Sequence, residues 1–196
     1  MSDTYELVKE FHKVMDQPIR TTPDTHVPEV NLRWELIQSE VVEFLDALFK
    51  KDDIEVADGL GDIVYVVDGA ALTFGLGPIV LVPYDKNADD DGTMVLLLTI
   101  ALSQLGEALA MHNPDLVRIS LSMIKSACYS LAERKGWDLD EIIDVIHKSN
   151  LTKLGDDGKP VYITEGPEKG KVTKSANYVP PTKDIADILS RVNNGS

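Results

Sequence analysis

Acidic side chains recur at helical spacing between residues 31 and 69, and this pattern constrains the chain more than any other feature. Glu40 and Glu43 are three residues apart, and Glu55, Asp58 and Asp62 follow at separations of three and four. Side chains three or four residues apart share one face of a helix. The sequence therefore predicts two helices, each with a row of carboxylates along one side.

Apolar stripes border both acidic rows. They consist of Ile37, Val41, Phe44 and Leu48 on the first helix and of Val56, Leu60, Ile63 and Val67 on the second. Because only a short polar segment, residues 49–53, separates the two helices, we expect them to pack antiparallel. The carboxylates would then meet and repel each other. Mg²⁺, which takes oxygen ligands, would relieve that repulsion. The alternative is two solvated acidic faces in an acid-rich chain.

The two acidic motifs resemble those of the MazG-like, all-α nucleoside triphosphate pyrophosphohydrolases, whose relatives include dimeric dUTPases and phosphoribosyl-ATP pyrophosphatases. The first motif, ExxE, is Glu40-Val41-Val42-Glu43, and the second, of ExxD type, is Glu55-Val56-Ala57-Asp58. Asp62, one helical turn further on, is an alternative for the aspartate of the second motif. Glu55, Asp58 and Asp62 therefore all remain candidates.

The resemblance implies an enzyme that hydrolyses a (deoxy)nucleoside triphosphate to the monophosphate and pyrophosphate, with a role in nucleotide-pool control. It implies Mg²⁺ as the cofactor, with Mn²⁺ able to substitute. The metal ligands would be Glu40, Glu43, Glu55, Asp58 and Asp62. Either Glu40 or Glu43 would also act as general base on the attacking water. The family further implies a homodimer or homotetramer whose subunits share the active site.

The run His147 to Gly155, with the sequence HKSNLTKLG, resembles the C-terminal motif of the same family. The asparagine and lysine of that motif contact substrate phosphates or metal-bound groups. This implies Asn150 and Lys153 as substrate contacts, with Lys148 behind them. A lysine suits the role because its ammonium group is a cationic hydrogen-bond donor.

The loop from Asp16 to Glu29 contains three prolines and has no helical period. In the family, the segment at this place helps to enclose the nucleotide base. Gln17 and Asn31 are therefore candidates for contacts with the base or sugar, although Gln17 could equally mark the end of a helix. Arg20 is the loop's only arginine, and a phosphate contact and a surface role are equally compatible with its position.

Helical periodicity predicts an all-α bundle in one domain covering residues 1–196. The expected helices cover residues 4–15, 28–49, 53–74, 93–111, 114–135, 139–147 and 182–192. Residues from about 78 to 136 look like a helical-hairpin insertion, and residues from about 155 to 196 like an irregular extended tail. In this tail, residues 161–164 and 171–173 are expected to pair as a hairpin. The helix over 93–111 is so apolar that we expect it to be buried on more than one side, against another subunit.

Composition and charge exclude several function classes. The net charge of −14 argues against a nucleic-acid-binding surface. The single cysteine, Cys128, allows no intrachain disulfide and fits a reducing cytoplasm. The start of the chain lacks the pattern of a signal peptide, and the apolar run near Ile79 is too short to span a membrane. We therefore expect a cytoplasmic protein with neither nucleic-acid nor membrane partners.

Three other functions compete with a general pyrophosphohydrolase. A ferritin-like di-metal protein requires two Glu-x-x-His motifs, but the chain offers only the related run from Asp144 to His147. A non-catalytic helical adaptor or oligomerisation module would leave the acidic rows in solvent. A dUTPase-specific enzyme would share the metal motifs and differ in its contacts with the base.

Overall fold

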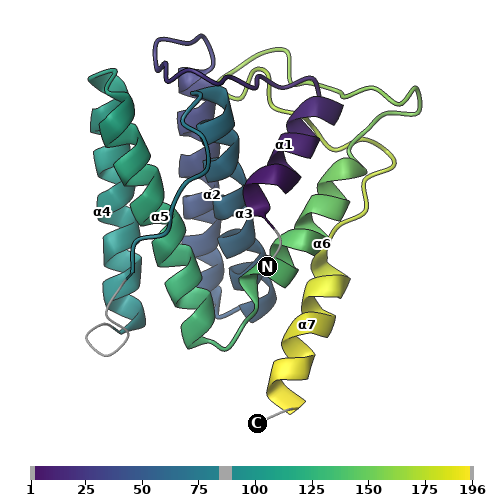
Figure 1. Cartoon of the computed structure of the whole chain (residues 1–196). Coiled ribbons are helices and arrows are strands. Elements are labelled where there is room, and N and C mark those ends of the chain that lie inside the picture. Colours follow the sequence, from purple (N-terminus) through teal and green to yellow (C-terminus); the bar gives the residue numbers. More distant parts are fainter. Residues whose placement is uncertain (1–2, 84–89, 195–196) are drawn as a thin grey trace.

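The computed structural model describes residues 3–83 and 90–194, and this part of the chain contains seven α-helices and no β-strand (Figure 1). The helices are α1 (Thr4–Val14), α2 (Val30–Lys50), α3 (Asp53–Thr73), α4 (Asp91–Ala110), α5 (Pro114–Arg134), α6 (Leu139–Leu151) and α7 (Thr182–Asn194). The predicted all-α bundle is confirmed. The predicted end of the sixth helix at residue 147 was wrong, because α6 continues to Leu151 and includes most of the C-terminal motif.

A two-residue turn joins α2 to α3 and makes them antiparallel neighbours. Lys51 ends α2 in the left-handed conformation, with φ of 57°. The side chain of Asp52 then caps α3 by accepting hydrogen bonds from the backbone N–H groups of Ile54 and Glu55. Asp53 is the first residue of α3, and its carboxylate pairs with Lys135.

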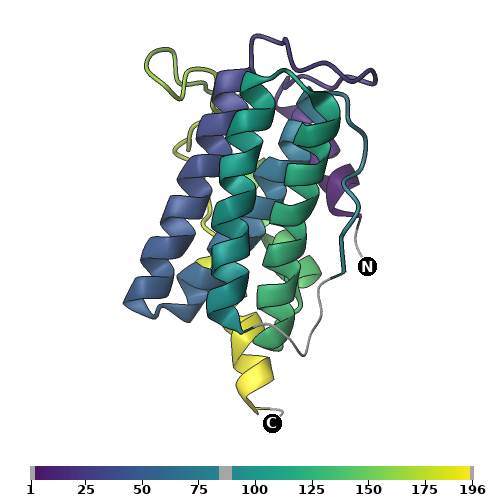
Figure 2. The same ribbon diagram turned by 90° about the vertical axis from the view of Figure 1, so that its left-hand side faces the viewer.

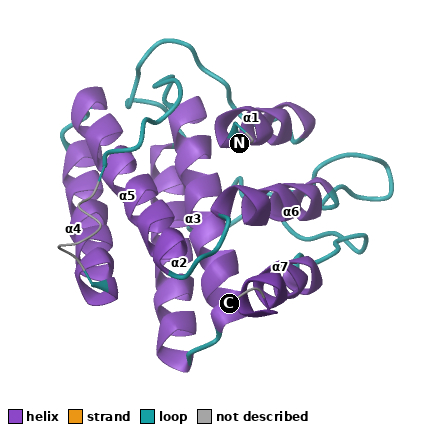
Figure 3. Cartoon of the chain, turned by 60° about the horizontal axis from the view of Figure 1, so that its bottom comes forward, coloured by secondary structure: helices purple, strands orange, loops and turns teal. Residues whose placement is uncertain are grey.

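Helix α3 lies at the centre of the bundle. Figure 3 shows α4 and α5 on one side of the α2–α3 pair and α1, α6 and α7 on the other. Two glycines of α3 allow its neighbours to approach closely. A Cβ atom on Gly59 would lie 3.1 Å from the Cα atom of Phe44 in α2, and one on Gly61 would lie 2.3 Å from Cδ1 of Ile146 in α6. The two glycines are two positions apart, about 200° around the helix, so they let α2 and α6 approach α3 from different directions.

Helices α4 and α5 form a hairpin that packs against α3 through α5, and α4 forms the outer edge of the bundle (Figures 1 and 2). Within one chain α4 is buried on one side only: Leu96 and Ile100 are 58% and 41% exposed. By length and composition alone α4 could also cross a membrane, with a mean hydropathy of 1.6, although a core helix can meet the same test.

The tail from residue 155 to residue 181 crosses back toward α1. The predicted hairpin forms as an antiparallel bridge between Tyr162 and Val172 rather than as two strands. Backbone N–H groups of Ile163, Gly170 and Thr173 donate across it to the carbonyl oxygens of Lys171, Ile163 and Val161. The hydroxyl of Tyr162 donates to the carbonyl oxygen of Met15. The hydroxyl of Ser149 donates to the carbonyl oxygen of Val179, 2.6 Å away. These bonds tie the tail to the ends of α1 and α6.

Candidate functional site

A cavity of about 300 Å³ lies between α1, α2, α3, α6 and the tail. All five acidic residues that the sequence singled out line it, as do Gln17, Asn150 and Lys153. The acidic residues are Glu40 and Glu43 from α2 and Glu55, Asp58 and Asp62 from α3. The antiparallel packing of α2 and α3 therefore brings both acidic rows to one cavity.

The carboxylates in this cavity are partly buried, and neighbouring carboxylates raise one another's pKa values. Burial raises the pKa of Glu40 to about 8, with further contributions from Asp62 and Glu43. Burial also raises the pKa of Asp58 to about 8, helped by Asp62 and Glu55. The pKa of Asp62 rises to about 6 through burial, against the opposing effect of Lys153. Asp62 thus acts on acids of both helices and stands at the centre of the cluster.

The carboxylates of this cluster are of the type that binds a divalent cation, but they are not arranged around a single ion. Within residues 3–83 and 90–194, no group of three or more Asp, Glu, His or Cys side chains is arranged to hold a metal ion. However, the Oδ1 atom of Asp58 is buried and has no hydrogen-bond partner. Carboxylate oxygens are the ligands that Mg²⁺ prefers, so the donor types suit this ion, and rotation of the side chains would have to bring them together.

Three lysines face the carboxylates across the cavity. Lys153 follows α6, and burial lowers its pKa against the opposing effects of Asp62 and Glu40. Lys171 and Lys174 come from the tail and were not anticipated, although they belong to a basic run, KGKVTK, in an acidic chain. The Nζ atoms of Lys153 and Lys174 lie 5.8 Å and 4.8 Å from the ring centroid of Tyr178, which also lines the cavity.

The structure does not bring Lys148 and Asn31 to this cavity. Lys148 is exposed. It lies two positions before buried Asn150, and two positions correspond to about 200° around a helix, so its side chain points to another side of α6. Asn31 is likewise two residues from Arg33 and lines a different hollow, beside Trp34 of α2 and Gly106 of α4. The structure therefore places these two residues away from the acidic rows.

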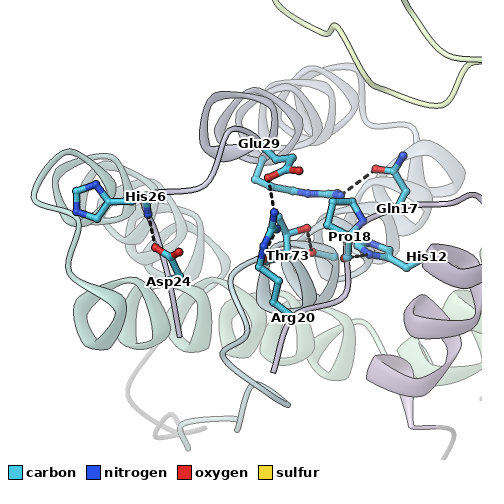
Figure 4. Close-up of polar contacts among 10 residues, drawn as sticks. His12, Gln17, Pro18, Arg20, Asp24, His26, Glu29 and Thr73 are labelled. Carbon is cyan, nitrogen blue, oxygen red and sulfur yellow. Dashed lines mark hydrogen bonds and ion pairs between the residues drawn. The ribbon is translucent and has the colours of Figure 1, made fainter. Parts of the chain in front are cut away.

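Arg33 and His12 line the end of the cavity away from the acids, and no sequence motif had indicated either residue. The buried guanidinium of Arg33 donates to Oε1 of Gln17 at 3.0 Å. Gln17 and His12 lie on the same side of the loop in Figure 4, and the Nδ1 atom of His12 is 2.8 Å from the carbonyl oxygen of Pro18. A single arginine within a helix carries no sequence signal that distinguishes it from a surface residue.

Arg20 has a structural position rather than a place in the cavity. Its guanidinium donates to the carbonyl oxygen of Thr73 at 2.8 Å and to the carboxylate of Glu29 at 3.0 Å (Figure 4). The backbone N–H of Arg20 also donates to the carbonyl oxygen of Leu72. These bonds fasten the proline-bearing loop to the C-terminal end of α3 and so hold Gln17 at the cavity.

Residues 8–81 match the phosphoribosyl-ATP pyrophosphohydrolase family. This family is a relative of the MazG-like, all-α pyrophosphohydrolases that the acidic motifs resemble, and the match covers the first part of the chain. The matched segment contains both acidic rows, Gln17 and Arg33, and it ends before the α4–α5 hairpin. The match supports a pyrophosphohydrolase-type activity in general terms.

An individual viral protein is similar to this chain over most of its length. The chain is 29% identical over 177 residues to the uncharacterized protein L479 of Acanthamoeba polyphaga mimivirus, and the alignment covers 76% of this chain and 70% of the viral protein. No solved structure matches significantly. The substrate therefore has to be inferred from the cavity itself.

Proposed function

We propose that this protein is a Mg²⁺-dependent enzyme that hydrolyses a (deoxy)nucleoside triphosphate to the monophosphate and pyrophosphate. One observation carries the proposal: a single cavity has five carboxylates of α2 and α3 on one side and Lys153, Lys171 and Lys174 on the other. A triphosphate with its cation carries both signs of charge and needs both kinds of partner. We expect the enzyme to act in the cytoplasm, in control of the nucleotide pool.

The carboxylates are suited to hold the cation. The raised pKa values of Glu40 and Asp58 reflect burial and mutual repulsion, which a bound divalent cation would offset. The unpartnered Oδ1 atom of Asp58 is available as a ligand. When bound, Mg²⁺ polarises phosphate oxygens and lowers the pKa of a coordinated water, and Mn²⁺ would substitute for it.

The remaining groups in the cavity would bind and orient the substrate. Lys153 and Asn150, at the end of α6, would donate to phosphate oxygens, and the two tail lysines would add positive charge on the same side. Glu40 or Glu43 would accept the proton of the attacking water. A non-catalytic adaptor would instead leave its acids in solvent, which the burial of Asp58 and Asp62 disfavours.

Release of pyrophosphate from a panel of ribo- and deoxynucleoside triphosphates, with phosphoribosyl-ATP included, tests the proposal. We expect turnover with Mg²⁺ and none after chelation. Asp58→Asn should abolish it, whereas Asp46→Asn, on an exposed part of α2, should leave it unchanged. If none of these nucleotides releases pyrophosphate under any condition with Mg²⁺ or Mn²⁺, the proposed function is wrong.

A further inference from the structure

The cavity continues beyond the carboxylates to a second end. The residues at this end have no role in the hydrolysis described above. Arg33 of α2, His12 of α1, Gln17 of the loop and Gly69 of α3 line this end. Arg33 precedes Glu40 by seven residues, and Gly69 follows Asp62 by seven. At 1.5 Å per helical residue, the two ends are therefore about 10 Å apart along both helices.

Arg33 is a buried cation with an unused hydrogen-bond donor. Its side chain is buried, with 5% of the residue exposed, and its Nε atom has no hydrogen-bond partner. Burial lowers the pKa of the guanidinium to about 10, so it stays protonated at neutral pH. A buried donor without a partner costs about 1–3 kcal/mol. A ligand atom that accepts from this Nε atom would recover that cost.

His12 provides a hydrogen-bond acceptor at the same end. Its Nδ1 atom faces the carbonyl oxygen of Pro18, which can only accept, so Nδ1 carries the proton. Burial lowers the pKa of His12 to about 3, so the ring is neutral and Nε2 presents a lone pair. A Cβ atom on Gly69 would lie 3.1 Å from this Nε2 and 3.3 Å from Nη1 of Arg33. Both nitrogen atoms therefore lie close to Gly69 and to each other, where a larger side chain in place of the glycine would crowd them.

We propose that this end binds the nucleobase, and that Arg33 and His12 recognise a ring carbonyl beside a ring N–H. Guanine, uracil and thymine have this pair of groups, whereas adenine has no carbonyl and cytosine has no ring N–H beside its own. The inference rests on the proposed function and specifies its substrate class. The separation of about 10 Å suits a nucleoside, whose sugar lies between base and phosphates. Phe11, which lines the cavity as well, offers an aromatic surface against a base.

A phosphate group would fit the Arg33–His12 end of the cavity less well than the uncharged carbonyl and N–H groups of a nucleobase. The guanidinium alone would attract an anion, but the Nε2 lone pair of His12 lies against the same glycine and would repel an anion. A carbonyl next to an N–H satisfies both groups at once. Sites that hydrogen-bond a substrate in this way reject analogues lacking the matching group strongly, because buried polar atoms are then left unpaired.

The test compares kcat/KM for dGTP, dUTP and dTTP with that for dATP and dCTP. We expect the wild type to favour the first three by at least about 100-fold. Arg33→Met keeps the side-chain volume and removes the donors, and it should reduce that preference to less than about tenfold by slowing only the favoured substrates. Gly69→Ala is a second variant, expected to raise KM for the same substrates. Arg134→Met, on α5 outside the cavity, is the matched control and should change nothing.

Binding of α,β-methylene analogues, which cannot be cleaved at the relevant bond, separates this inference from the proposed function. If dUTP and dGTP analogues bind more tightly than the dATP analogue, and Arg33→Met removes the difference, base recognition stands even if no nucleotide is hydrolysed. Equal or tighter binding of the adenine analogue would overturn it. A uniform loss of affinity for all bases in Arg33→Met would also overturn it, since Arg33 would then be structural.

Discussion

The Nζ atom of Lys125 in α5 lies 2.8 Å from both carboxylate oxygens of Asp68 in α3, in the interior of the bundle. The Thr4 hydroxyl of α1 joins this pair by donating to Asp68 at 2.7 Å and accepting from Lys125 at 3.0 Å. Burial raises the pKa of Asp68, and the nearby lysine opposes that rise. The pair fastens the α4–α5 hairpin to the helices of the site.

Lys125→Met should destabilise the fold severely. The substitution leaves the carboxylate of Asp68 buried without its cation, which typically costs about 3–5 kcal/mol. Urea unfolding followed by circular dichroism measures the change. The double variant Lys125→Met/Asp68→Asn should recover much of the lost stability, because the uncompensated charge is gone. A loss below about 1 kcal/mol in the single variant would contradict the prediction.

The second acidic motif has two possible alignments, which amide variants distinguish. Asp62 acts on the pKa values of both Glu40 and Asp58, whereas Glu55 is exposed and affects only Asp58 among them. We therefore expect Asp62→Asn to abolish pyrophosphate release and Glu55→Gln to reduce it less. The reverse order would favour the Glu55–Asp58 pair. Unimpaired turnover in all of the amide variants at limiting Mg²⁺ would refute a catalytic role for both rows.

Without divalent cations, Asp58 should make the fold less stable as the pH rises. Its pKa is raised from 3.8 to about 8, so between these values the folded state keeps a proton that the unfolded state has released. The unfolding free energy therefore falls as the pH rises through this window and levels off above about pH 8. Melting temperatures from pH 5 to pH 9 should show a smaller fall in Asp58→Asn than in the wild type. Asp187→Asn, exposed on α7, serves as the control, and Mg²⁺ should reduce the fall in the wild type.

Lys153→Ala should weaken transition-state stabilisation by about 1–3 kcal/mol, the range for a lost hydrogen bond to a charged group. The expected readout is a lower kcat/KM for the nucleotide, with Mg²⁺ affinity in its absence hardly changed. Lys148→Ala is a close control, because Lys148 lies on the exposed side of α6. Equal kinetics in both variants would make Lys153 an ordinary surface lysine.

The exposed apolar side of α4 predicts a homodimer or homotetramer. Leu96 and Ile100 lie one turn apart on it and are 58% and 41% exposed. Leu96→Glu/Ile100→Glu should shift the protein toward a monomer of 21.6 kDa in light scattering, because buried charges would oppose the contact. A wild-type protein that is active as a dilute monomer would contradict the prediction.

The sequence by itself determined the helices and the chemistry along each of them. Apolar periodicity is a local property, so it predicted all seven helices, including α7 at the end of the tail. The spacing of Glu40, Glu43, Asp58 and Asp62 also placed each acidic row on one helix face. The turn between α2 and α3 is so short that it left only an antiparallel arrangement, and this brought the rows together.

Only the tertiary structure decided what faces the acids. Lys171 and Lys174 reach the cavity because the tail is tied to α1 and α6, a contact between residues far apart in the sequence. Arg33 replaces Asn31 at the cavity because the rotation of α2 depends on how it packs against α3 and α1. A sequence pattern specifies which residues share a helix face, but packing between helices decides toward which neighbour that face turns.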